Sequence, residues 1–97
     1  MSDADLPAEK VMDACDLAIS ESQKLAADNW ETTYVDHPEN RPIGLTRETF
    51  IENWPSVAIP RVVMLRKLCV AARVGGQPMM RVTLEDFEQI SRFYFSN

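Results

Sequence analysis

The chain has 97 residues, of which 45% are hydrophobic and 26% are charged, and its net charge is −5 at pH 7. These values are typical of a single globular domain, residues 1–97. No run of about 18 apolar residues is present, which excludes a helical membrane span. The acidic start, MSDADLPAEK, lacks the positive charge of a secretory signal, so we expect a cytoplasmic protein.

Acidic residues are concentrated in the first part of the chain. Residues 1–57 contain twelve Asp and Glu against four Lys and Arg, whereas residues 58–97 contain three against six. The split indicates either an acidic face offered to a basic partner or ion pairs between the two parts, and we favour the pairs. The net negative charge disfavours direct nucleic-acid binding, which depends on neutralising phosphates.

Residues 7–29 are predicted to form one amphipathic helix. Pro7 suits the first helical turn, and apolar or small residues recur at spacings of three and four. Small residues at the centre of the stripe would let another helix approach closely. The stripe consists of Val11, Cys15, Ala18, Ser22 and Leu25.

The segment WETTYVDHPENRPIG interrupts the helical pattern. Its β-branched and aromatic residues at 32–35 favour a short extended segment, and the prolines and Asn within 36–44 favour a surface loop. We also expect residues 1–6 to be a flexible N-terminus.

A short pattern, apolar–Thr–x–Glu–x–Phe, occurs twice, at residues 45–50 and 82–87. Thr46 and Thr83 are each placed to accept a backbone N–H at a helix start. The apolar residue before each Thr and the Phe after it occupy the positions of a hydrophobic staple, and Asp86 nearly completes a capping box. Each copy therefore predicts a helix entry.

Three further helices follow from these signals. The first, at 47–53, is short because Pro55 disfavours helix at the residue before it. The second begins at Pro60 and ends at 75–76, where two glycines follow. The last covers 84–95 and buries Phe87, Ile90 and either Phe93 or Tyr94. A short strand at 79–82 could pair with 32–35.

The helix at 60–74 is predicted to be the centre of the fold. On a helical wheel, apolar residues cover nearly its whole circumference, which is typical of a buried helix. Arg66 and Arg73 would leave the core through a narrow slot. The predicted fold is therefore mainly α, a compact bundle of about four helices around a central apolar helix.

Few residues offer catalytic or metal chemistry. Cys15 and Cys69 lie 54 positions apart in predicted helices, which indicates buried free thiols in a reducing compartment, with a disulfide between the helices as the alternative. His37 has no nucleophile motif beside it and is interpreted as a surface histidine. With one histidine and no C-x-x-C, we expect no metal site and no cofactor.

Charged side chains supply the candidate binding residues. Glu9, Asp13 and Asp16 share one helix face and could ligate a divalent ion or meet a basic partner, although a solvated face explains them as well. Arg66 and Arg73, one heptad apart, could clamp an anion or pair with those acids. The remaining cations of this group are Arg61, Lys67 and Arg81.

Trp30 and Trp54 each lie close to a predicted helix end. They either cap the core or form, with Tyr34, an aromatic contact patch of the kind that carries binding hot spots.

These observations favour a small non-enzymatic interaction protein that binds another macromolecule and inhibits or regulates it. We expect a protein partner and self-association, most simply as a dimer. Size and composition also agree with an accessory protein of a phage or mobile element. The alternative is a binder of a small anionic, nucleotide-like ligand held by Arg66, Arg73 and the aromatic residues. An enzyme would require His37 or a carboxylate pair to titrate abnormally.

Overall fold

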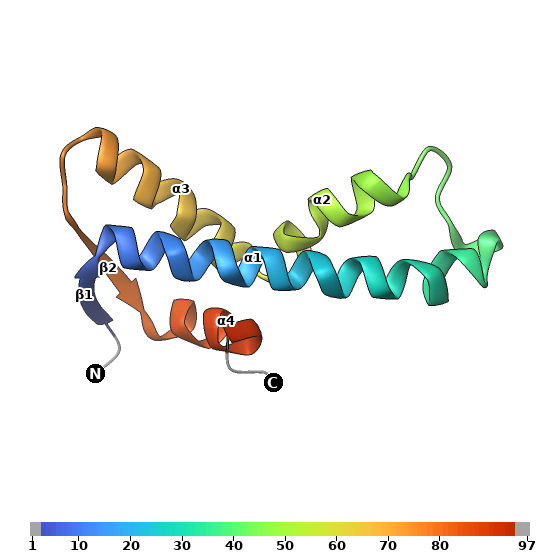
Figure 1. Ribbon diagram of the computed structural model, residues 1–97, viewed down its shortest axis with the longest axis horizontal. Helices are drawn as coiled ribbons and strands as arrows, with labels where there is room; N and C mark the ends of the chain where they lie inside the picture. Colours follow the sequence, from blue (N-terminus) through green and yellow to red (C-terminus); the bar gives the residue numbers. More distant parts are fainter. Residues whose placement is uncertain (1–2, 95–97) are drawn as a thin grey trace.

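The computed structural model describes residues 3–94 of the chain. It is mainly helical, with four packed α-helices and one small antiparallel sheet (Figure 1). The elements are, in chain order, β1 (Asp3–Pro7), α1 (Ala8–Trp30), α2 (Arg47–Ala58), α3 (Pro60–Val74), β2 (Met79–Thr83) and α4 (Leu84–Tyr94). The mainly α fold with about four helices is therefore confirmed.

The longest helix, α1, occupies the centre of the molecule. It packs against α2, α3, α4 and both strands, and Figure 1 shows α3 and α4 on either side of its N-terminal half. The prediction that the helix at 60–74 is central is wrong. That helix forms with the predicted bounds, but it covers α1 from one side only, because α1 is longer and alone reaches all the other elements.

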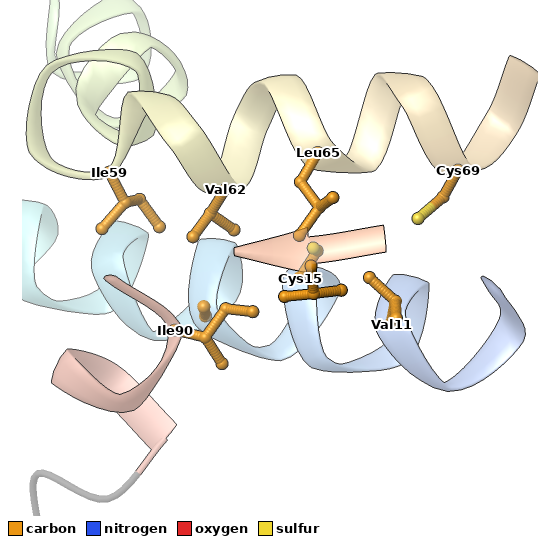
Figure 2. Packing of buried hydrophobic residues seen from close by; sticks show 9 residues of the cluster. Val11, Cys15, Ile59, Val62, Leu65, Cys69 and Ile90 are labelled. Carbon is orange, nitrogen blue, oxygen red and sulfur yellow. The ribbon is translucent and has the colours of Figure 1, made fainter. Parts of the chain in front are cut away.

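The buried core gathers aliphatic residues from both ends of the chain. Figure 2 shows α3 projecting its inner side onto α1, with α4 contributing Ile90 from the other direction. Cys15 of α1 and Val62 of α3 are fully buried there. The complete cluster is Val11, Cys15, Ala18, Ile59, Val62, Leu65, Cys69, Val82 and Ile90.

The sheet joins the N-terminus to the segment after α3. Leu6 pairs with Met80 and Asp5 with Arg81 in antiparallel register, and the N–H of Ala8, at the start of α1, donates to the carbonyl of Pro78 (2.7 Å). The expected flexible N-terminus includes residues 1–2, outside the described residues. Residues 3–6 instead lie in β1, because their backbone groups pair with β2.

The segment at 32–35 does not form a strand, so the expected pairing with 79–82 is wrong. Helix α1 continues directly into a π-helical turn, η1 (Glu31–Val35), and the N–H of Asp36 donates to the carbonyl of Glu31 (2.8 Å). The Tyr34 ring packs on Trp30, with ring centroids 5.0 Å apart. This packing overrides the weak extended preference of the β-branched residues. The loop expected at 36–44 is present, with one short 3-10 turn, η2 (Pro38–Asn40).

Helix α2 is longer than predicted. It runs through Pro55 to Ala58 rather than ending at residue 53. The φ angle of proline fits a helix, so the cost is the missing N–H and the crowding of the preceding turn. Burial of Pro55 offsets this cost.

The predicted helix ends are confirmed where local signals set them. The hydroxyl of Thr46 accepts the N–H of Thr49 (3.1 Å), and Thr83 and Asp86 exchange both bonds of a capping box (3.2 and 3.0 Å). Gly75 follows the last residue of α3, and Gly76 has φ +76°. Helix α4 ends at Tyr94, and the predicted last position, 95, lies outside the described residues.

Candidate interaction surface

The outer side of α3 is a largely apolar surface without a covering element among the described residues. Its inner side buries Val62, Leu65, Cys69 and Ala72. Arg61, Met64, Leu68 and Ala71 follow one another at spacings of three, four and three on the outer side, and all four are exposed. We call Met64, Leu68 and Ala71 the outer ridge. Met64 is 55% and Leu68 50% exposed, whereas a helix buried on all sides was expected at 60–74.

A second apolar strip of α3 borders α1. Val70 is 39% and Val74 85% exposed. Together with Met12 of α1 and Arg73 they line a shallow hollow of about 340 Å³, the α1/α3 hollow. The all-round apolar wheel of α3 therefore reflects one buried side and two uncovered apolar strips.

Two arginines of α3, Arg66 and Arg73, face α1, as expected if they pair with the acids of that helix. Arg66 Nε donates to the carboxylate of Asp16, and this hydrogen bond raises the pKa of Arg66 above its ordinary value. Arg73 Nη1 lies 3.6 Å from the sulfur of Met12. Pairing of Arg66 with the acidic helix is thus present, while Arg73 reaches α1 through a thioether rather than a carboxylate.

The two remaining arginines of the candidate group lie near the sheet and α4. Arg81 Nε is 3.8 Å from a carboxylate oxygen of Asp5 on the neighbouring strand. Arg61 Nη1 lies 3.4 Å from Glu85 and 3.9 Å from Asp86. The Arg81 pair joins the two strands, and the Arg61 pairs join α3 to the first turn of α4, so these pairs position elements.

All three carboxylates predicted as an acidic face are exposed, and one of them is paired. Asp16 is engaged by Arg66. Glu9 and Asp13 are exposed and make no ion pair within the described part of the chain. The small residues Ala18 and Ser22 of the same helix are fully buried in the protomer. This small-residue stripe, one basis for expecting self-association, is therefore not available to a second copy.

The three predicted aromatic residues come together in one cluster. Trp30 lies 5.0 Å from Tyr34 and 5.4 Å from Phe50, and Phe50 lies 5.5 Å from both Tyr34 and Trp54, measured between ring centroids. Trp30 is buried and the other three rings are half-buried. Sequence reasoning missed Phe50 as the central member, although its spacing of four from Trp54 was a signal.

The aromatic cluster and the arginines of α3 do not form one site. The cluster lies at the C-terminal end of α1 against α2, whereas Arg73 contacts Met12 near the N-terminal end of α1. Figure 1 shows α2 and α3 over different halves of α1. Arg66 lines a cleft of about 340 Å³ among α1, α2 and α3 with Lys67, but Asp16 and Glu52 line it too. Two carboxylates in the same cleft oppose the binding of an anion.

An apolar groove lies between β1, α1, β2 and α4. It has a volume of about 310 Å³, and Lys10 is the single charged residue among the described residues that line it. Leu6, Val82 and Phe87 are among its walls, and Phe87 is 39% exposed rather than buried as predicted. Ile90 is buried as predicted, and the predicted burial of Phe93 or Tyr94 concerns side chains outside the described ones.

The titratable residues considered as chemical candidates are His37, Cys15 and Cys69. His37 is exposed, with Nδ1 3.5 Å from Glu39. Cys15 and Cys69 are free, buried thiols, and burial raises the pKa of both, that of Cys15 to about 12. Neutral buried thiols are poor nucleophiles. Within residues 3–94 no three His, Cys, Asp or Glu side chains gather as a metal site would require, and no helix there is long and apolar enough to cross a bilayer.

Comparison of the chain with protein-family models, curated proteins and solved structures found no match. The case for a function therefore depends on the geometry of the outer side of α3.

Proposed function

We propose that this protein is a small non-enzymatic interaction protein that binds another protein and thereby inhibits or regulates it. The observation that carries the proposal is the outer ridge, where two large apolar side chains on one helix are half exposed. Adjacent exposed apolar side chains of this kind mark surfaces that bind other proteins.

The spacing of the outer ridge indicates the kind of partner. Arg61, Met64, Leu68 and Ala71 follow the three-four repeat by which one helix packs against another. Ala71 leaves room for close approach, and flexible Met64 can adapt to the contact. A partner that presents an amphipathic helix fits this surface best.

Further features of the proposal have less direct support. A cytoplasmic location agrees with the two free thiols. A place among accessory proteins of phages or mobile elements has only size and composition behind it. The alternative, a small anionic ligand, has weaker support because Arg66 is paired with Asp16 and the aromatic residues lie elsewhere.

The test is affinity purification from the organism that encodes the protein, with wild type, Leu68→Glu and Leu25→Glu compared. Leu25 is a matched control because it is 43% exposed but lies on α1. We expect one protein to be enriched by wild type and by Leu25→Glu, and to be lost with Leu68→Glu. Equal recovery by all three variants, or no enriched protein with wild type, contradicts the proposal.

A further inference from the structure

We infer that the protein forms a two-fold dimer. In this dimer, the face of α1 and α3 that contains the α1/α3 hollow packs on the same face of the second copy. This goes beyond the proposed function, because it uses the side of α3 that borders α1 and leaves the outer ridge free. Three observations carry it: the exposed strip of Val70 and Val74, the unpaired acids of α1, and the unequal charge of the two helices.

The two helices carry opposite charge. Helix α3 contains four cationic side chains and no carboxylate, whereas α1 contains five carboxylates and two lysines. Two α3 helices packed directly on each other would bring like charges together, which opposes association. The acidic side of α1 is the complementary surface for α3 of a second copy.

The direction of the helices makes this arrangement reciprocal. Contacts of Arg66 with Asp16 and of Arg73 with Met12 show that α1 and α3 are antiparallel neighbours. A two-fold axis that lies in the face they share, parallel to the helices, exchanges their positions, so α3 of each copy lies over α1 of the other. Such an interface is isologous, and every favourable contact occurs twice.

Three of the four charged side chains that would meet have no ion-pair partner within the described part of one copy. Glu9, Asp13 and Lys67 are exposed and make no ion pair inside the described part of the chain. In the dimer the two acids face Lys67 and Arg73 of the second copy. Val70, Val74 and Met12 supply the apolar contact between these charges, and the hollow of about 340 Å³ has room for side chains from the other side.

Charge reversal with mixing tests the arrangement. One variant, Glu9→Lys with Asp13→Lys, reverses the acids, and a second, Lys67→Glu with Arg73→Glu, reverses the bases. In a dimer of either variant alone, like charges meet at both contacts. Sedimentation equilibrium should therefore show a dissociation constant at least about tenfold higher than that of wild type. A heterodimer of the two variants has opposite charges at both contacts, so an equimolar mixture should regain dimers.

Two controls separate this inference from the proposed function. Asp28→Lys with Glu31→Lys reverses one exposed acid near the C-terminal end of α1 and one at the start of η1, and should leave the dimer unchanged. Leu68→Glu, which disables the outer ridge, should also remain dimeric. Three outcomes would each overturn the inference: a monomeric wild type, a mixture that does not regain dimers, or loss of the dimer with Leu68→Glu. The binding of another protein is measured separately, by affinity purification.

Because both reversed variants alter exposed side chains, folding is checked by circular dichroism before mixing. Recovery on mixing itself requires two folded chains. If the base-reversed variant associates more tightly than wild type, α3 packs on α3, and the reciprocal arrangement is wrong.

Discussion

The two halves of α1 are covered in different ways. The N-terminal half packs into an aliphatic core with α3, β2 and α4, and most residues of this core are buried (Figure 2). The C-terminal half packs with η1 and α2 through four aromatic rings, three of them half-buried. The first half joins segments far apart in the chain, while the second joins segments that are close in sequence.

The aromatic half also carries an unpaired polar group. The indole N–H of Trp54 is buried and has no acceptor among the described residues, and such a group costs about 1–3 kcal/mol. The polar groups at the aliphatic end are better satisfied, since Thr83 and Asp86 exchange two hydrogen bonds. We therefore expect the aliphatic half to set global stability and the aromatic half to open first.

The largest effect is expected at the aliphatic core. Leu65→Ala removes a side chain that is 3% exposed, and the lost burial together with the cavity should cost about 3 kcal/mol of unfolding free energy. Urea denaturation measures this. Leu17→Ala, at a 41% exposed leucine of α1, is the control and should cost less than about 1 kcal/mol. Equal losses would show that the aliphatic half is not the stabilising core.

A smaller effect, confined to one half, is expected at the aromatic cluster. Phe50→Ala removes the ring that contacts Trp30, Tyr34 and Trp54. Because Phe50 is only half-buried, the cost should be about 2 kcal/mol. Hydrogen exchange should accelerate in α2 and η1 while α3 and α4 keep their protection. Faster exchange in all helices would mean that the two halves unfold as one unit.

The elements that the sequence predicted correctly are set by local chemistry. Thr46 and the Thr83–Asp86 pair act through atoms within three residues of one another. The two glycines after Val74 end α3 through the backbone conformation of Gly76. Such signals do not depend on what the rest of the chain does, so periodicity and turn chemistry were sufficient for these bounds.

The predictions that failed concern arrangement in space. A wheel shows that α3 is apolar all round, but it cannot distinguish a helix covered on every side from one with uncovered strips. The pairing of β1 with β2 joins segments that are far apart in the chain, and no local sequence pattern predicts that Leu6 lies opposite Met80. At Pro55 burial of the residue, and at Tyr34 contact with Trp30 of α1, outweighed the local preference.

The same limit applies to the candidate site. Pairing of Arg66 with the acidic helix followed from the charge split, because opposite charges on packed helices tend to meet. The aromatic residues and Arg73 lie toward opposite ends of α1. This separation depends on the path of the connection at 36–44, which the spacing of residues in the sequence does not predict.

The smallest effect is a pH dependence that also reports on the aliphatic half. Burial holds the Cys15 thiol neutral and raises its pKa from 9.0 to about 12, so the folded chain keeps a proton that the unfolded chain loses above pH 9. Stability from this group is therefore complete below pH 9 and falls as the pH rises toward 12. Between pH 8 and 10 the expected loss is about 1 kcal/mol.

Comparison of wild type with Cys15→Ala at both pH values isolates this contribution, because lysine and tyrosine titration is common to the two chains. With a reductant present throughout, wild type should lose about 1 kcal/mol more unfolding free energy than the variant between pH 8 and 10. Cys69, whose pKa burial also raises, remains in both chains, and its charge contributes to the raised pKa of Cys15, so the difference includes the coupling between the two thiols. Identical losses would mean that water reaches Cys15. The aliphatic half would then exclude water no better than the aromatic half.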